Sequence, residues 1–565
     1  MDKQIYRERK DFSTVRELVE WAGSTHGDKP AYSYRLNPGD SEPVRISFNR
    51  LRQDVRSLAS ELIAMGCAGK HIAVIGKLSY DFALMYFSVL SIGAVLVPLD
   101  RDWHSEDLAD TCSKAEADFL FIDEDIADKA PSILERCPGC HAPVYMNAVH
   151  NSDCVALLTT RGSLKYAENP KAYSEAPIDP DALSLLVFTS GTTGKGKGVM
   201  LTQTAVLLDI TCAIPYIDVG KNTIGVLPPH HTYGSTVMFI GHAAFGAEVY
   251  ISSGLRHITK ELKEQKPEHM VMVPLYLETF YRRIMSTVKE QGKDKLLFNM
   301  IKVSNGLRKV GIDRRKQLFA SLREAFGGEL RTIVSGGAPI NQEILEFFES
   351  IGINTLNGYG ITECAPLIAV NRSKNVVPGS VGNVIPIDHV IIDEPNEFGE
   401  GEILVKGPNV MLGYFGDEAA TSAVFTDDGY FRTGDYGRLD NGDILTITGR
   451  KKNLIILSNG KNVYPEEIEN EIIAVPGVLE IVVYEGKSRR KPEYNAIVAE
   501  IFPDEEYIKK NGIEDVKAYL KKYIDDYNKT AVPYKKIQVL KIRKSEFPKN
   551  TLRKIKRFEI DTEID

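Results

Sequence analysis

The chain is organised around Leu185-Leu-Val-Phe-Thr-Ser-Gly-Thr-Thr-Gly-Lys-Gly-Lys-Gly-Val199, where an apolar run leads into a loop of glycines, hydroxyls and lysines. Glycine lets backbone N–H groups turn inward and approach a ligand closely. The hydroxyl and lysine side chains add further donors and positive charge. This composition predicts a buried strand, Leu185 to Phe188, followed by a loop that wraps a polyphosphate.

The same loop nearly matches the Walker A pattern, since Gly191 is followed at the right spacing by Gly196 and Lys197. Gly198, however, stands where a Ser or Thr would have to hold Mg²⁺. A P-loop NTPase is therefore not expected, and the metal ligand must lie elsewhere in the chain. The alternative to a polyphosphate-binding loop is a glycine-rich hairpin without a ligand, but such turns rarely combine hydroxyls and lysines so densely.

Length and composition indicate a multidomain globular protein. A chain of 565 residues exceeds one compact core, and its net charge of −8 argues against a nucleic-acid partner. Seven cysteines, an odd number, do not suggest a disulfide framework. The tract from Lys535 to Arg557 is strongly basic, and we interpret it either as a solvated face or as a basic surface that contacts phosphates.

Two local patterns suggest sites or segments that the rest of the chain does not support. Cys137-Pro-Gly-Cys140-His141 matches a haem-attachment pattern, but it also reads as a β-turn, and a zinc half-site would need a second pair. Phe82 to Leu99 is uncharged, yet Gly93 and Pro98 divide it into a helix over 81–92 and a strand over 94–97. With no apolar leader at the N-terminus, we expect a cytoplasmic protein with at most peripheral membrane contact.

Hydrophobic patterning predicts an α/β fold. Phe48, Leu51, Val55, Leu58 and Leu62 step along an amphipathic helix, and helices then alternate with short apolar strands, as in a parallel sheet covered by helices. The stretch from Leu330 to Pro339 is expected to be a strand, a glycine turn and a helix that begins near Pro339. Further strands are expected at 71–75, 119–122, 247–251 and 269–273.

The pattern of apolar and turn residues changes towards the C-terminus. From about Gly379 the pattern becomes β-rich, which suggests a small β-barrel subdomain over about 379–449, and after Arg450 it becomes α+β. We therefore expect a large N-terminal domain of layered α/β sheets, 1–449, and a small mobile C-terminal domain, 450–565. The polar run Gly449 to Asn453 has the character of a hinge.

Six motifs occur in one order along the chain. They are Thr189-Ser-Gly-Thr-Thr-Gly-Lys-Gly-Lys-Gly198, Ser335-Gly-Gly-Ala-Pro339, Asn357-Gly-Tyr-Gly-Ile-Thr-Glu363, Tyr430-Phe-Arg-Thr-Gly-Asp435, Gly449-Arg450 with Ser458-Asn-Gly-Lys-Asn-Val-Tyr-Pro-Glu-Glu-Ile-Glu469, and Pro548-Lys-Asn-Thr-Leu-Arg-Lys554. Together they resemble the adenylate-forming, AMP-binding superfamily. The resemblance covers essentially the whole chain and is greatest to long-chain fatty acid–CoA ligases.

The resemblance implies two half-reactions. A carboxylate attacks the α-phosphate of ATP to give an acyl-adenylate and pyrophosphate, and a thiol then displaces AMP. The first step brings an anion to a polyanion, so it needs cationic groups and N–H donors around the phosphates. By resemblance, Glu363 holds Mg²⁺, Thr362 contacts the α-phosphate, and the loop Thr189, Ser190, Gly191, Thr192, Thr193, Gly194 and Lys197 binds the β- and γ-phosphates.

The remaining nucleotide contacts also rest on the resemblance. Gly336, Gly337 and Ala338 match one wall of the adenine slot, and Tyr359 matches the other. Asn357, Gly358 and Gly360 belong to the same motif and are expected to bind the nucleotide as well. Asp435 matches the ribose ligand, and Arg450 matches a second ribose or phosphate contact. Lys554 matches the lysine that bridges the carboxylate and the α-phosphate, although Arg553 replaces the glycine common before it.

The second half-reaction implies a moving C-terminal domain in this family. Lys452 matches the hinge, Gly460 matches the glycine beside the pantetheine tunnel, and His231 matches the histidine near the acyl carboxylate. We favour His231 over His230 from its register with Leu227-Pro228. A metal site at the histidine pair is a minor alternative.

The acid and the thiol are less well specified. His231 to Met238 contains no acidic residue, so an α-amino acid would leave its ammonium unpaired at a cost of roughly several kcal/mol. The segment from Asn305 to Arg331 resembles the long-chain branch and favours a medium- to long-chain fatty acid, with an aryl or short-chain acid as alternatives. The acceptor is CoA or the phosphopantetheine of an acyl-carrier protein. Two other functions remain as alternatives to an acid-activating ligase: a non-catalytic nucleotide or acyl-adenylate sensor, and an ATPase.

Overall fold

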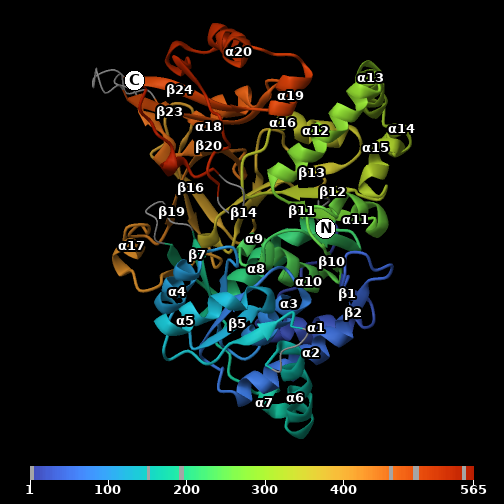
Figure 1. Ribbon diagram of the computed structural model, residues 1–565, viewed down its shortest axis with the longest axis vertical. Helices are drawn as coiled ribbons and strands as arrows, with labels where there is room; N and C mark the ends of the chain where they lie inside the picture. The colour runs from blue at the N-terminus through green and yellow to red at the C-terminus, as the bar shows by residue number, and fades with distance from the viewer. Residues whose placement is uncertain are drawn as a thin grey trace. The chain divides into compact units, whose positions relative to one another are not determined.

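The strand that precedes the glycine loop lies inside a seven-stranded sheet (Figure 1). The computed structural model describes residues 5–148, 153–189, 196–456, 462–487, 495–549 and 555–564. In sheet order the strands are β18 (Gly413–Tyr414), β8 (Lys197–Thr202), β7 (Leu183–Thr189), β4 (Val95–Leu99), β3 (His71–Ile75), β5 (Phe119–Asp123) and β6 (Val144–Met146). Strands β7, β4, β3, β5 and β6 are parallel, whereas β8 is antiparallel to β7 and makes a hairpin with it.

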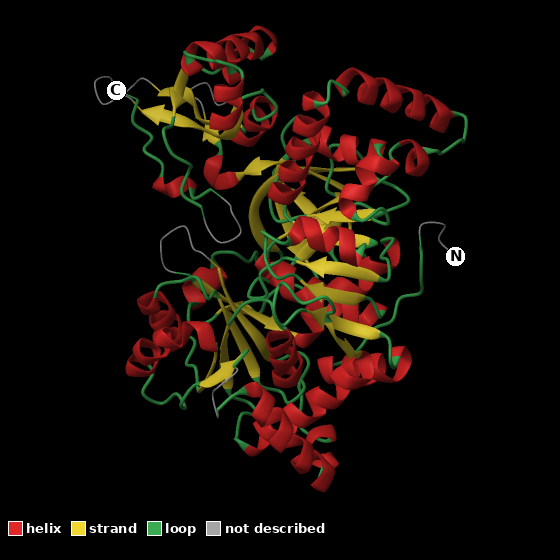
Figure 2. Cartoon of the chain, turned by 45° about the vertical axis from the view of Figure 1, so that its right-hand side comes forward, coloured by secondary structure: helices red, strands yellow, loops and turns green. Residues whose placement is uncertain are grey.

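Helices cover the strands of this sheet (Figure 2). Helix α2 (Phe48–Ala64) begins at Ser47, whose hydroxyl accepts the Arg50 N–H, and the helix buries the apolar stripe predicted from its spacing. The uncharged segment is helix α3 (Tyr80–Leu90) followed by β4, with Gly93 between them in the left-handed region at φ 69°. Among the described ranges, every helix is too short or too polar to cross a lipid bilayer.

Two further groups of strands complete the larger part of the chain. A four-stranded sheet has the order β2 (Val44–Ser47), β1 (Pro30–Tyr34), β10 (Glu248–Ile251) and β9 (Asn222–Gly225). The other group runs β11 (His269–Met272), β12 (Thr332–Ser335), β13 (Asn354–Gly360), β14 (Leu367–Val370) and β15 (Gly382–Val384). Strands β11, β12 and β13 are parallel, so the glycine turns after β12 and β13 leave the same sheet edge.

The helix expected after the glycine turn, with Pro339 near its start, is α16 (Gln342–Ser350), which begins three residues after that proline. The Asn341 side chain accepts the Glu343 N–H at 2.8 Å, as an N-cap residue does, so the cap and not the proline sets the start.

The remaining helices of this larger part lie around its sheets. They are α1 (Val15–His26), α4 (Ser105–Lys114), α5 (Ala130–Arg136), α6 (Val155–Glu168), α7 (Pro170–Ser174), α8 (Gln203–Ala213), α9 (Thr232–Ser235), α10 (His242–Phe245), α11 (Ile258–Gln265), α12 (Pro274–Glu290), α13 (Asp294–Lys309), α14 (Arg315–Leu318), α15 (Ala320–Arg323) and α17 (Glu418–Ser422).

The backbone divides into two compact units. The first contains 1–337, 344–389 and 405–431, and the second contains 338–343, 390–404 and 432–565. In the second unit, β20 (Ile444–Arg450), β19 (Phe431–Asp440), β17 (Gly401–Lys406) and β16 (His389–Asp393) pair in that order, and β21 (Ile455–Ile456) pairs with β22 (Asn462–Val463). Its C-terminal part packs α18 (Pro465–Ile472), α19 (Glu505–Lys510) and α20 (Val516–Thr530) with the sheet β23 (Val478–Lys487), β24 (Asn495–Pro503) and β25 (Val539–Ile542).

The α/β fold class expected from the sequence is thus confirmed. An apolar core joins α18, α20 and the three-stranded sheet, as the α+β pattern after Arg450 predicts. The domain boundary near Gly449–Asn453 and the hinge at Lys452 stay predictions.

Candidate active site

The two ends of the glycine loop are held opposite each other by the β7–β8 hairpin. Thr189 and Lys197 are partners across the two strands, and Lys114 of α4 donates to the Gly196 carbonyl at 2.8 Å. A Cβ atom on Gly196 would lie 2.8 Å from the Thr189 carbonyl oxygen, so glycine is required there. The predicted phosphate ligands Ser190, Gly191, Thr192, Thr193 and Gly194 lie outside the described residues.

Lys197 is linked through a tyrosine to Glu363, the predicted magnesium ligand. The Lys197 ammonium lies 4.3 Å from the centre of the Tyr414 ring, and the Tyr414 hydroxyl donates to Glu363 Oε1 at 3.0 Å. Burial, together with the Glu363 carboxylate, raises the pKa of Tyr414, so the hydroxyl remains a donor at neutral pH. Sequence reasoning missed Tyr414, because only the pairing of β18 with β8 brings it beside the loop.

Glu363 sits in a turn whose backbone is fixed by neighbouring strands. It belongs to a short 3₁₀ turn, Thr362–Cys364, and its carbonyl accepts the Met411 N–H at 2.8 Å. Gly360 ends β13 so close to Pro366 that a Cβ atom would lie 1.8 Å from the Pro366 carbonyl oxygen. Only glycine fits this close approach, so backbone packing alone explains why the predicted site position 360 is a glycine.

The two predicted adenine walls lie on adjacent strands. Ser335 at the end of β12 is the register partner of Asn357 in β13, so Gly336 and Gly337 leave the sheet next to Gly358, Tyr359 and Gly360. A Cβ atom on Gly336 would lie 3.3 Å from Tyr233 Cζ and 3.5 Å from the Gly358 carbonyl oxygen. Tyr233 is fixed there because its hydroxyl donates to the Val334 carbonyl at 3.1 Å. Ala338 follows directly in the chain.

The histidine pair lies at the start of α9. The rings of His230 and His231 are 4.2 Å apart, and His230 Nε2 lies 3.5 Å from Asp100 Oδ2. Burial lowers the pKa of His230 to about 4, so its neutral ring can donate towards Asp100 at physiological pH. Among the described residues no cluster of three His, Cys, Asp or Glu side chains could hold a metal ion, so the minor metal alternative at this pair receives no support.

A buried polar cluster lies behind the Glu363 turn. The Asn409 amide nitrogen is 3.2 Å from Asp209 Oδ1 and 3.2 Å from Asp388 Oδ2, and it also contacts the carbonyls of Cys364 and Leu367. Burial raises the pKa of Asp388 to about 8, and burial together with the charge of Asp388 raises that of Asp209 well above its usual value. The cluster therefore joins the turn to α8 through at least one protonated carboxyl group.

The raised pKa of Asp388 predicts a stability that falls with rising pH. Between about pH 4 and pH 8 the folded protein keeps a proton that the unfolded chain releases, so stability drops as pH rises through the folded pKa. Asp388→Asn removes this proton while preserving the shape of the side chain. Unfolding free energies should fall by about 2 kcal/mol between pH 6 and pH 8 in the wild type and by clearly less in the variant.

Urea unfolding at a series of pH values measures this difference. The exposed Asp110→Asn is the control, and it should keep the wild-type pH dependence. An Asp388→Asn profile that runs parallel to the wild-type profile would contradict a protonated Asp388.

The second unit holds the predicted ribose residues. Arg450 Nε lies 2.9 Å from Asp435 Oδ1, across the β19–β20 pairing, and Asp435 is almost fully buried. Lys452 is exposed in a 3₁₀ turn directly after β20. Two further predicted residues, Gly460 beside the pantetheine tunnel and the adenylation lysine Lys554, lie outside the described residues.

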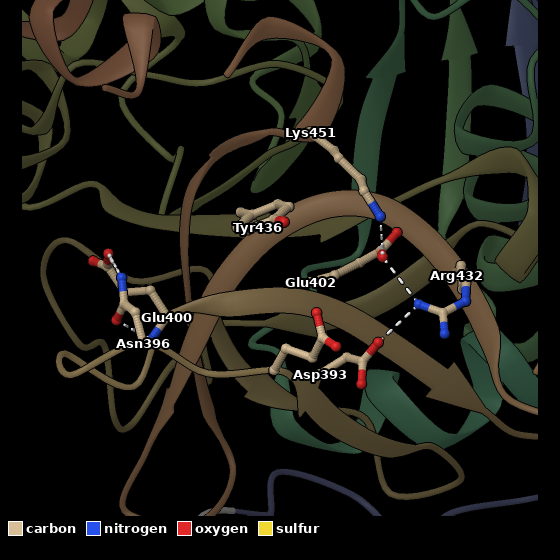
Figure 3. Close-up of a pocket in the computed structure, with 8 residues that line it drawn as sticks. Asp393, Asn396, Glu400, Glu402, Arg432, Tyr436 and Lys451 are labelled. Carbon is tan, nitrogen blue, oxygen red and sulfur yellow. Dashed lines mark hydrogen bonds and ion pairs between the residues drawn. The ribbon is translucent and has the colours of Figure 1, made fainter. Parts of the chain in front are cut away.

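A charged hollow of about 210 Å³ adjoins these strands (Figure 3). Glu402 accepts from Lys451 Nζ at 2.7 Å and from Arg432 Nη1 at 3.1 Å, and Arg432 also binds Asp393 at 2.8 Å. The hydrogen bond to Glu402 raises the pKa of Lys451, which keeps this lysine charged. The residue next to the predicted hinge is thus anchored by a paired carboxylate.

The Cys137–Cys140 segment forms a turn. The Cys140 N–H donates to the Cys137 carbonyl at 2.9 Å, and both thiols are free. This geometry agrees with the β-turn reading of that sequence.

Comparisons with known proteins identify the family. Residues 19–415 match the family described as AMP-binding enzyme. Long-chain-fatty-acid–CoA ligase FadD15 of Mycobacterium bovis is 30% identical over 478 residues, covering 81% of this chain and 78% of the relative.

Solved structures share the fold. ATP-bound MatB from Rhodopseudomonas palustris has a TM-score of 0.75 at 22% identity, covering 96% of this chain and 97% of that one. The o-succinylbenzoate CoA synthetase of Bacillus subtilis, in complex with its acyl-adenylate, has a TM-score of 0.71 at 20% identity over 98% of both chains. The chain therefore belongs to the AMP-binding enzyme family and is an ATP-dependent, adenylate-forming ligase that joins an acid to a thiol.

Proposed function

We propose that this enzyme activates a medium- to long-chain fatty acid with ATP and transfers the acyl group to the thiol of CoA. The observation that carries the proposal is the Lys197–Tyr414–Glu363 contact at the mouth of the glycine loop. It groups a cation, a neutral donor and a carboxylate where a polyphosphate and its metal would meet. The relative named as a long-chain-fatty-acid–CoA ligase supports the choice of acid and thiol.

Glu363 fits a magnesium ligand. Among the described residues only its Oε1 accepts a hydrogen bond, from Tyr414, so its Oε2 can bind a hard cation. Mg²⁺ usually takes one or two carboxylates and completes its shell with water and substrate phosphates, so no larger cluster of ligands is needed. When bound, the ion would neutralise charge on the phosphates of ATP.

The other predicted residues divide between binding and reaction. Thr189, the glycine loop and Lys197 would bind the β- and γ-phosphates, and Thr362 would contact the α-phosphate. Asp435 and Arg450 would bind the ribose, and Lys554 would bridge the attacking carboxylate and the α-phosphate. His231 would lie beside that carboxylate, backed by the neutral His230 ring and Asp100.

The second half-reaction is proposed to use a different position of the C-terminal domain, 450–565, relative to the N-terminal domain, 1–449. Rotation about Lys452 would remove Lys554 and bring Gly460 to the thiol entrance. The ion pair of Lys451 with Glu402 would fix the residue that precedes the pivot. Transfer to an acyl-carrier protein is the alternative for this step, since the same phosphopantetheine arm would enter.

The acid is the least constrained part of the proposal. The segment after His231 is uncharged, which suits an apolar acyl chain better than an ammonium group. One solved structure of similar fold, the o-succinylbenzoate CoA synthetase, carries the name of an aryl acid. Aryl and short-chain acids are therefore tested beside fatty acids.

Pyrophosphate release tests the proposal directly. With ATP and Mg²⁺, release should depend on the added acid and should rise from short to long fatty acids, with benzoate and malonate as comparison acids. Added CoA should convert the adenylate to a thioester, and holo carrier protein in its place measures the alternative acceptor. Acid-independent phosphate release would instead indicate a plain ATPase, and nucleotide binding without any product would indicate a sensor.

A further inference from the structure

Helix α13 presents an outer face that its own packing does not use. The helix lies at the edge of the larger unit, beside α14 and α15 (Figure 1). Leu297 and Ser304, seven residues apart, are its buried residues, so a single stripe faces the protein. The Arg308 guanidinium pairs with Glu349 at 2.6 Å and fixes the end of the helix. The opposite side is left to solvent.

Large apolar side chains gather on and just after this helix. Five of the 14 exposed large hydrophobic residues in the described chain fall within 17 residues: Leu296 (56%), Phe298 (46%), Val303 (61%), Val310 (71%) and Ile312 (47%). Leu296, Val303 and Val310 are spaced by seven residues, or about two turns, so they form one stripe along the helix axis. Single exposed leucines are ordinary, but an aligned concentration of this kind marks a contact surface.

A stripe of lysines runs beside the apolar one. Lys295, Lys302 and Lys309 each precede one of the three apolar residues, so they repeat with the same seven-residue spacing. All three are exposed, and they make no ion pair or hydrogen bond within the described part of the chain. From residue 293 to 316 the sequence holds eight Lys or Arg and two Asp, in a protein of net charge −8.

The charge pattern decides between the possible occupants. A second copy of this helix would bring like charges together across the stripe, which disfavours self-association. An acidic protein would satisfy the lysines but would need a matching apolar groove for a continuous row of Leu and Val. An anionic membrane surface satisfies both, because lysine heads reach the phosphates while the apolar row enters the headgroup boundary.

We propose that the outer face of α13, defined by Lys295, Leu296, Lys302, Val303, Lys309 and Val310, docks the enzyme peripherally onto an anionic lipid bilayer. This surface lies outside the residues assigned to adenylation. Docking does not depend on the identity of the acid. The docking proposal can therefore fail while the proposed ligase activity is confirmed, and the ligase proposal can fail while docking is confirmed.

Flotation of the full-length enzyme with vesicles tests the docking. Vesicles of phosphatidylcholine with phosphatidylglycerol should bind the wild type at low salt, and vesicles of phosphatidylcholine alone should bind it weakly. The triple variant Lys295→Gln, Lys302→Gln, Lys309→Gln should lower the partition coefficient roughly a hundredfold, since each lysine near an anionic surface contributes about a factor of five. Leu296→Ser with Val303→Ser should lower it about tenfold and leave the salt dependence in place.

A matched control removes the same charge elsewhere. Lys517, Lys521 and Lys522 are exposed on α20 in the other unit, and their triple Gln variant should bind vesicles like the wild type. If this control lowered the partition coefficient as much as the α13 variant does, net charge alone would explain vesicle binding, and the assignment to α13 would be overturned. Wild-type binding without preference for phosphatidylglycerol would also overturn it, as would capture by an acidic carrier protein in place of vesicles. Pyrophosphate release in detergent-solubilised substrate should be unchanged in all three variants, which confirms that they fold.

Discussion

Glu363→Gln should slow acid-dependent pyrophosphate release by about 10²–10³-fold, because the amide cannot hold the magnesium ion against the phosphates of ATP. The Tyr414 hydroxyl can still donate to the remaining side-chain oxygen, so the turn that carries residue 363 should keep its shape. The loss is therefore expected in metal-dependent chemistry and not in folding. Raising the magnesium concentration should recover part of the rate.

Initial rates of pyrophosphate release across a magnesium series measure this effect. Glu418→Gln, an exposed glutamate on α17, is the matched control and should retain wild-type rates. Tyr414→Phe should give an intermediate loss, since it removes one hydrogen bond to the carboxylate but leaves the aromatic ring over Lys197. A Glu363→Gln enzyme with the wild-type rate and magnesium dependence would refute the role of Glu363 as the metal ligand.

Lys554→Ala should reduce adenylate formation by about 10²–10³-fold and leave thioester formation from supplied acyl-adenylate nearly intact. The reason is that the lysine charge is proposed to bridge two anions only in the first half-reaction. In the second, the C-terminal domain is proposed to carry it away from the site. A general loss of folding would lower both half-reactions together, so the comparison separates a chemical role from a structural one.

The two half-reactions are measured separately, by pyrophosphate release and by CoA-dependent consumption of synthetic acyl-AMP. Lys556→Ala removes a nearby charge of the same basic tract, one that pairs with Glu559 at 3.1 Å, and it should affect neither reaction strongly. Equal losses in both half-reactions for Lys554→Ala would rule out the domain rotation.

The sequence by itself determined the family, the alternation of elements and the identity of most candidate residues. These follow from local information: apolar runs between glycine turns, and motifs whose residues lie within about ten positions of one another. The strand before the glycine loop, β7, could be expected because the run Leu185 to Phe188 is apolar, but its hairpin with β8 was not predicted. The helix after β12 begins three residues after Pro339, where the Asn341 side chain accepts the Glu343 N–H.

Only the tertiary structure brought distant segments together. Tyr414 lies 51 residues after Glu363, yet its hydroxyl is 3.0 Å from Glu363 Oε1. Asp100 lies 130 residues before His230, yet its Oδ2 is 3.5 Å from His230 Nε2. The Asp209–Asn409–Asp388 cluster behind the Glu363 turn likewise joins three segments that share no motif. Such contacts depend on strand order and on burial, which set both the neighbours of a side chain and the pKa values of its ionisable groups. Patterns along the chain record which residues are apolar or charged, but the packed sheet decides which of them meet.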